Sequence, residues 1–129
     1  MIPPARASEW AKFVAGFGYA YQGLCYALRT QRNVRVHLVI AMFAIGLGIV
    51  LKISPVEFAM IFVAITNVFI AEMFNTAIEL CVNLASPTYH PLAKTAKDVA
   101  AGAVLLNAML SVIIGLFVFG PYVWAVFFK

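Results

Sequence analysis

Charged side chains are scarce in this chain. Of its 129 residues only 11% are Asp, Glu, Lys or Arg, whereas 64% are hydrophobic and the mean hydropathy is +0.97. A soluble domain of this size could not cover so much apolar surface with so little polar material. The composition therefore predicts a small integral membrane protein, too short for a separate soluble nucleotide-binding domain of the usual ~100–150 residues.

Other features are also rare or missing. The two cysteines, Cys25 and Cys81, favour free thiols over a disulfide or a metal pair. The basic residues that give the net charge of +4 flank apolar segments and form no dense patch, so a nucleic acid partner is not expected. The first nine residues contain prolines but no apolar core before a cleavage site, which argues against a signal peptide.

An aromatic stripe marks the N-terminal part. Ser8 is a good N-cap, and Glu9 suits the first turn of a helix. The apolar residues that follow recur at helical spacing, which predicts an amphipathic helix over about residues 8–34 that lies in the membrane interface. The stripe consists of Trp10, Phe13, Val14, Phe17, Tyr21, Leu24 and Leu28.

Three longer apolar segments predict membrane-spanning helices, so the whole chain, residues 1–129, is one all-α membrane domain. Lys52, Ser54 and Pro55 mark the first turn between spans, and Ser86-Pro87 ends the second span before a polar loop over residues 88–96. Gly120-Pro121 is expected to kink or end the last span. The expected spans are about residues 36–53, 56–85 and 98–128.

The basic residues predict the orientation. Seven of the nine Lys and Arg residues fall in the N-terminal segment and the second loop, which the positive-inside rule places on the cytoplasmic side of the membrane. The seven are Arg6, Lys12, Arg29, Arg32, Arg35, Lys94 and Lys97, against Lys52 and Lys129 on the other side.

Glu72, Asn75 and Glu79 stand inside the second apolar segment. At about 100° per residue they share one helix face. Glu72 lies about 24 Å along the helix from Val56, near the inner boundary of the hydrocarbon core. An ionisable group there costs at least ~2.5 kcal/mol, which predicts a functional site. A polar seam between protomers and a proton or ion relay are the alternatives.

A second polar group follows at the mouth of the last span. Lys97 stands next to Asp98, at a depth similar to that of the carboxylate face. A cation beside acidic groups at the cytoplasmic interface is what a magnesium-phosphate substrate requires. The chain has no G-x-x-x-x-G-K-[ST] phosphate loop, so a nucleotide would have to be held in another way.

These patterns resemble the prokaryotic integral membrane diacylglycerol and undecaprenol kinases over about Trp10 to Phe119. The resemblance implies a homotrimer with active sites between protomers, in which MgATP gives its γ-phosphoryl group to a lipid hydroxyl at the cytoplasmic interface. The matching segments are Glu72-Met-Phe-Asn-Thr-Ala-Ile-Glu79, Tyr89-His-Pro-Leu-Ala-Lys94 and Ala96-Lys-Asp98, with Gly18-Tyr19, Gly23-Leu24 and Arg32-Asn-Val-Arg-Val-His37 upstream.

The same resemblance implies roles for individual residues. Glu72 would be the general base that takes the proton of the lipid hydroxyl, and Asn75 would orient Glu72 and the acceptor. Glu79 would hold the magnesium that bridges the ATP phosphates, and Lys97 would neutralise charge on the transferring phosphoryl group. Asp98, Tyr19 and His90 would lie at the nucleotide, and Lys12 would stand near the lipid substrate in place of the usual arginine.

Two positions depart from the family pattern. Gln31 stands where the family commonly has a metal-binding glutamate beside ATP, and Asn83 replaces the usual aspartate. We therefore expect one magnesium brought in by ATP and no tightly held second ion. A degenerate kinase retained as a lipid-binding scaffold, or a non-catalytic membrane oligomer, is the alternative function. The sequence does not separate diacylglycerol from undecaprenol as the acceptor.

A few further residues have simpler interpretations. His37 is expected to be an interfacial histidine, because it has no partner at metal-ligand spacing. Asn67 and Asn107 are expected to form hydrogen bonds between helices. Gly46 and Gly48 are expected to allow close helix packing.

Overall fold

Residues 8–128, the part that the computed structural model describes, form four α-helices and no strand. They are α1 (Glu9–Thr30), α2 (Arg32–Leu51), α3 (Pro55–Ala85) and α4 (Pro91–Phe127). The last three are long and apolar enough to cross a membrane, with mean hydropathies of 2.3, 1.8 and 2.4. The predicted fold class, a surface helix followed by three transmembrane helices, is confirmed. Arg6 and Lys129, which enter the charge count, lie outside the described residues.

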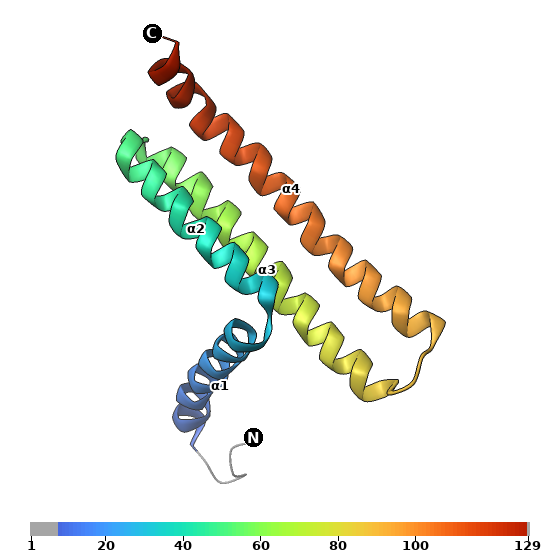
Figure 1. Ribbon diagram of the computed structural model, residues 1–129. Coiled ribbons are helices and arrows are strands. Elements are labelled where there is room, and N and C mark those ends of the chain that lie inside the picture. Colours follow the sequence, from blue (N-terminus) through green and yellow to red (C-terminus); the bar gives the residue numbers. More distant parts are fainter. Residues whose placement is uncertain (1–7, 129) are drawn as a thin grey trace.

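The three long helices run side by side, and α1 turns away from them (Figure 1). Helix α3 is central, since it packs mainly against α4 and next against α2. The α2–α3 turn and the C-terminal end of α4 lie at one end of the molecule. The α3–α4 connection and α1 lie toward the other end, which is therefore the end that carries most of the basic residues.

Helix α1 begins as expected and ends earlier. The Ser8 side chain accepts a hydrogen bond from the Ala11 backbone N–H at 3.2 Å and caps the helix. The expected end near residue 34 is wrong, because Gln31 has extended backbone (ψ 116°) and separates α1 from α2. The first span consequently starts at Arg32 and not at Val36.

The aromatic stripe of α1 is exposed. Trp10 stacks on Phe13, and Phe13 meets Phe17 edge to face along the helix; the exposed fractions of these three residues are 72%, 58% and 66%. A soluble helix would bury such a face against a core, whereas a helix in the membrane interface turns it toward lipid. The exposure therefore fits the predicted position at the membrane surface.

A tight turn joins α2 and α3, as the sequence predicts. Lys52 ends α2 in the left-handed conformation (φ 52°). Ser54 and Glu57 then form a capping box, with the Ser54 N–H donating to Glu57 Oε2 at 2.7 Å and the Glu57 N–H donating to Ser54 Oγ at 3.3 Å. Tyr122 Oη also donates to Glu57 Oε2 at 2.7 Å, so the outer ends of α3 and α4 are tied together.

The connection between α3 and α4 is shorter than expected. Helix α3 ends at Ala85, as predicted. Helix α4 begins at Pro91 and not near Asp98, because His90 caps it and proline is well suited to the first helical position. The residues from Pro91 to Lys97 are therefore helical. Nor does the last helix end at Gly120-Pro121, since α4 continues through Pro121 to Phe127.

One hydrogen bond links the middles of α3 and α4. Ser111 Oγ donates to the Ala64 carbonyl at 3.2 Å and to the Asn107 carbonyl at 2.9 Å. Asn107 is expected to form a hydrogen bond between helices, but its Nδ2 donates to the Ala103 carbonyl on its own helix at 3.1 Å. The serine, which is shorter, makes the contact between helices instead.

Candidate active site

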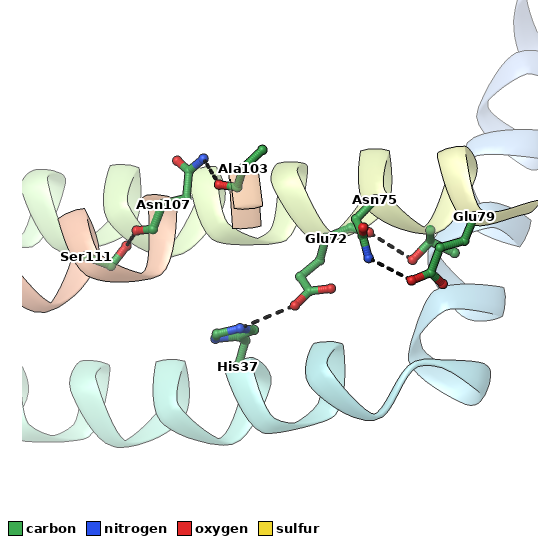
Figure 2. Close-up of polar contacts among 8 residues, drawn as sticks. His37, Glu72, Asn75, Glu79, Ala103, Asn107 and Ser111 are labelled. Atoms are coloured by element: carbon green, nitrogen blue, oxygen red, sulfur yellow. Dashed lines mark hydrogen bonds and ion pairs between the residues drawn. The ribbon is translucent and has the colours of Figure 1, made fainter. Parts of the chain in front are cut away.

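Glu72 is almost completely buried. The residue is 1% exposed, although it carries the carboxyl group that the sequence analysis singled out. Thr76 Oγ1 donates to the Glu72 carbonyl at 2.8 Å, which satisfies the hydroxyl inside the helix. From α2, His37 Nε2 lies 3.4 Å from Glu72 Oε1 (Figure 2). This contact is too loose to count as a hydrogen bond, and Oε1 has no other partner within residues 8–128.

Asn75 lies about one turn closer to the C-terminal end of α3 than Glu72. Its Nδ2 donates to Glu79 Oε1 at 3.2 Å (Figure 2). In this arrangement the amide orients Glu79, and its predicted action on Glu72 stays a prediction. Asn75 is 8% exposed, and its Oδ1 has no hydrogen-bond partner in the described part of the chain.

Two buried oxygens on one face of α3 thus lack partners, Glu72 Oε1 and Asn75 Oδ1. A buried polar group without a partner costs about 1–3 kcal/mol, so such atoms are rare in folded proteins. Here they are the two buried side-chain atoms without partners among residues 8–128, and both belong to the predicted site. The arrangement is typical of a site that a ligand completes.

Lys97 lies across from α3 on the first turns of α4. Its Nζ donates a hydrogen bond to Asn83 Oδ1 at 2.6 Å. This contact joins α4 to the C-terminal end of α3. Because Asn83 is neutral, the positive charge of Lys97 is oriented but not cancelled. Asp98 pairs with Lys94 at 2.5 Å on the exposed side of the same helix.

The remaining predicted residues lie farther from this group. Lys12 pairs with Glu9 at 2.6 Å on α1, and Tyr19 is exposed on the same helix. His90 Nδ1 accepts a hydrogen bond from the Leu92 N–H at 3.2 Å and is occupied with capping α4. Across residues 8–128, no hydrogen bond or ion pair joins any of these side chains to Glu72, Asn75 or Glu79.

Gln31 marks the joint between the surface helix and the first span. It is half-buried, and its backbone N–H donates to Ala27 O at 2.8 Å. Helix α1 does pass close to the motif, since a Cβ added to Gly23 would lie 3.9 Å from Met73 Cε. The structure therefore brings the surface helix near the motif, but it shows no bond from Gln31 to Glu79.

The donor set argues against a dedicated metal cage. Within residues 8–128 there is no group of three or more His, Cys, Asp or Glu side chains that could hold a metal ion. Mg²⁺ prefers oxygen ligands and usually keeps several waters, with one or two carboxylates and substrate phosphates completing its shell. The Glu79 carboxylate beside the free Asn75 Oδ1 fits such an ion when a nucleotide brings it.

An apolar groove opens beside the buried carboxyl group. It measures about 350 Å³ and lies between α2, α3 and α4. His37 lies at the site end of this groove, so the same side chain touches Glu72 and the groove. Small side chains leave the space open along the groove. Its lining includes His37, Ala41, Ala64, Phe69, Gly115 and Phe119.

A second groove of about 320 Å³ runs between α3 and α4. Three amides, Asn67, Asn75 and Asn107, line it together with apolar residues. Amides on membrane-spanning helices need hydrogen-bond partners, which neighbouring helices usually supply. This groove therefore brings the three amides together between α3 and α4.

Sequence reasoning missed three residues of this region. The sequence predicts only that His37 is an interfacial histidine. Its contact with Glu72, 35 positions further along the chain, depends on how α2 packs against α3, which the sequence does not specify. Thr76 lies inside the motif, and its hydroxyl donates a hydrogen bond to the backbone carbonyl of Glu72. A threonine four residues after Glu72 in a helix is a recognisable signal for this bond. Lys94 at four residues before Asp98 is likewise a recognisable helical pair.

The geometry describes a helical protein with three helices long and apolar enough to cross a membrane, a buried carboxyl group on one of them, and a lysine that bonds the end of the same helix. Comparison with known proteins gives the family. The model of the family described as prokaryotic diacylglycerol kinase matches residues 18–119. This chain belongs to that family.

Individual relatives agree with this assignment. The chain is 41% identical to the undecaprenol kinase of Bacillus subtilis (strain 168) over 114 residues, which cover 88% of this chain and 93% of the relative. It is 40% identical to a diacylglycerol kinase of Synechocystis over 116 residues, 87% of this chain and 66% of that protein. The diacylglycerol kinase of Escherichia coli (strain K12) is 27% identical over 108 residues, 84% of this chain and 88% of the relative.

The expected class of enzyme, a membrane lipid kinase, is confirmed by this family membership. The resemblance of the motif segments is confirmed with it. A non-catalytic ion-relay oligomer is not favoured.

Proposed function

We propose that this protein transfers the γ-phosphoryl group of MgATP to the hydroxyl group of a membrane lipid, either diacylglycerol or undecaprenol, at the cytoplasmic interface. The observation that carries the proposal is the Glu72 carboxyl group, buried in a long apolar helix with its Oε1 accepting no hydrogen bond from residues 8–128. A buried acid of this kind is retained because it does chemistry, since an apolar or amide side chain would be less costly there. The names of the relatives supply the two candidate acceptors.

Glu72 would act as the general base. As the lipid oxygen forms its bond to the γ-phosphorus, the hydroxyl proton passes to a Glu72 oxygen. The bond between the γ-phosphorus and the bridging oxygen breaks at the same time, and ADP leaves with that oxygen. A well-placed general base contributes about 10²–10⁴-fold to such a step.

The residues on the cytoplasmic side of Glu72 would hold the nucleotide. Glu79 is the metal ligand of the proposal, and Gln31 could add an amide oxygen once α1 closes on the motif. Magnesium held there would neutralise negative charge on the phosphate oxygens of the nucleotide. Lys97, held by the neutral Asn83 at 2.6 Å, would place its charge near the transferring group.

Four further residues complete the proposed site. Tyr19, His90 and Asp98 are assigned to the nucleotide, and Lys12 to the lipid substrate. All four are on segments toward the end of the molecule that carries most of the basic residues, on α1 or on the first turns of α4 and its cap (Figure 1). In a single chain they do not meet Glu72, so the proposal needs nearby segments of neighbouring copies.

We further propose that the protein is a homotrimer in the bacterial cytoplasmic membrane with its N-terminus in the cytoplasm. The excess of Lys and Arg on α1, α2 and the start of α4 supports this orientation. The second groove, with Asn67 and Asn107 on its walls, supports assembly, because a partner helix could satisfy these amides.

The apolar groove beside His37 and Glu72 gives the acceptor a place for part of its hydrocarbon chain. A lipid whose hydroxyl meets Glu72 would extend its chain along α2 and α3 toward Ala64 and Gly115. Both candidate acceptors carry such a chain, so the groove supports a lipid acceptor without separating the two.

The test is transfer of radiolabel from γ-labelled ATP to lipid by the purified protein in mixed micelles. Diacylglycerol and undecaprenol are offered separately while magnesium is titrated, and Glu72→Gln serves as the inactive control. Labelled lipid that depends on magnesium and disappears in the variant supports the proposal, and the preferred acceptor identifies the substrate. A folded protein that labels neither lipid at any magnesium concentration contradicts the proposal. That result favours a degenerate kinase, in which the neutral Gln31 and Asn83 have replaced charged residues that activity needs.

A further inference from the structure

His37 of α2 lies against the buried carboxyl group, and the Asn33 side chain of the same helix also reaches that group. Its Nε2 lies 3.4 Å from Glu72 Oε1, and its side chain is 22% exposed while that of Glu72 is 2% exposed. The charged or titratable groups that face Glu72 are His37 from α2 and Glu79 from its own helix. The histidine is therefore the titratable group on another helix that can donate a hydrogen bond to this carboxylate, beside the amide of Asn33.

We infer that His37 is a positioning residue for Glu72, holding one carboxyl oxygen so that the other faces the acceptor hydroxyl. The inference rests on the proposed function, in which Glu72 is the general base. His37 itself takes no proton from the substrate and touches no reacting atom. It acts through the carboxyl group alone.

The physical reason lies in the freedom of a glutamate side chain. The last torsion of glutamate is broad, so an unrestrained carboxylate has no fixed orientation. Glu72 Oε1 accepts no hydrogen bond from residues 8–128, and His37 Nε2 lies 3.4 Å from this oxygen. A neutral imidazole with its proton on Nε2 would donate to Oε1 once the 3.4 Å contact tightens. Glu72 Oε2 would then keep its lone pairs for the lipid hydroxyl.

The position of His37 at the head of the apolar groove strengthens the inference. The groove brings a lipid chain past the same side chain that holds the base. The acceptor hydroxyl and the Glu72 carboxyl group would thus be aligned by one element, α2. Misplacement of a reacting group by about 1 Å can cost about 10²-fold in rate.

Two substitutions separate positioning from packing. His37→Leu removes the donor but keeps an apolar side chain of similar size in the groove. His37→Gln keeps an N–H donor at a reach similar to that of Nε2. Turnover and the KM values for lipid and ATP are measured for both variants and for the unmodified chain in mixed micelles.

We expect His37→Leu to lower kcat by about ten- to a hundredfold while both KM values stay unchanged, because the alignment of the base is lost but binding is not. His37→Gln should recover most of the turnover. Equal behaviour of the two variants, or a loss that appears in KM and not in kcat, would overturn the inference.

A second measurement does not depend on kinase activity. The thermal unfolding midpoint in detergent is compared for His37→Leu and His37→Gln, with Glu72 intact and in a Glu72→Leu background. The leucine variant should unfold at a lower temperature than the glutamine variant only while Glu72 is present. An equal difference in both backgrounds contradicts the His37–Glu72 pairing. Unmodified protein that labels no lipid would refute the proposed function, and the unfolding data would still decide the pairing.

Discussion

Gly48 is the tightest glycine of the transmembrane helices, and adding a methyl group there should be destabilising. A Cβ at this position would lie 3.0 Å from Ile53 Cδ1 and 3.0 Å from Phe58 Cε1 and Cζ. Ordinary contacts between carbon atoms are ~3.5–4.0 Å. Ile53 is buried in the core next to the α2–α3 turn, and Phe58 packs against it, so neither side chain can move away freely.

The expected size of the effect is the balance of two terms. Overpacking of a filled core costs about 1–3 kcal/mol. Replacing glycine by alanine within a helix returns about 1 kcal/mol through helix propensity. Gly46→Ala is the matched control, because it lies two residues away on the same helix and no atom lies within 4 Å of its added Cβ. The control should gain the propensity term alone.

The assay is the free energy of unfolding from denaturant titration in a fixed detergent. Gly48→Ala should be about 1–3 kcal/mol less stable than Gly46→Ala, which isolates the steric cost. Equal stability of the two variants would refute the packing around the α2–α3 turn. Kinase activity of the folded Gly48→Ala protein should persist, since Gly48 lies near the opposite end of α2 from His37.

Two further predictions concern the nucleotide side of the site. Lys97→Met should lower turnover by about 10²–10³-fold, because the proposed function places its charge near the phosphates. Lys94→Met removes an exposed ion pair with Asp98 and should cost far less. Equal losses in steady-state kinetics would remove Lys97 from the proposed site. Glu79→Gln should raise the magnesium concentration needed for half-maximal turnover, because a neutral oxygen attracts the ion less strongly. A magnesium titration that is unchanged by this substitution would show that Glu79 is not a metal ligand.

The helices and their order could be predicted from the sequence because local signals mark them. Ser8, Ser54-Pro55 and Ser86-Pro87 all stand at helix ends in the structure, as predicted. The break at Gln31 was missed because no glycine or proline marks it. The chain turns there with a glutamine in extended conformation, which only the packing of α1 and α2 can select.

The start of α4 shows a different kind of miss. Proline at the first position of a helix after a capping residue is a recognisable signal, and His90-Pro91 carries it. The sequence pattern predicts a loop over residues 88–96, because these polar residues do not continue the apolar pattern of the span. A polar extension of a transmembrane helix beyond the hydrocarbon core has the same composition as a loop, so hydropathy alone could not separate them.

The carboxylate face was predictable, but its partners were not. The spacing of Glu72, Asn75 and Glu79 places them on one face, and the structure joins Asn75 to Glu79 there. The contact of His37 with Glu72 and the bond of Lys97 to Asn83 depend on neighbouring helices. Such contacts follow from helix packing, which no local pattern in the sequence specifies.

The central claim is that the buried Glu72 is the base of a lipid kinase, and a comparison of two glutamates on the same helix tests it most directly. Glu72→Gln and Glu57→Gln make the same chemical change on α3, and glutamine at position 57 still suits a capping box. Turnover with γ-labelled ATP and the preferred lipid is measured for both folded variants. We expect Glu72→Gln to lose about 10²-fold or more of kcat, as removal of a general base predicts, while Glu57→Gln stays close to the unmodified protein. Full turnover by the folded Glu72→Gln protein would contradict the account.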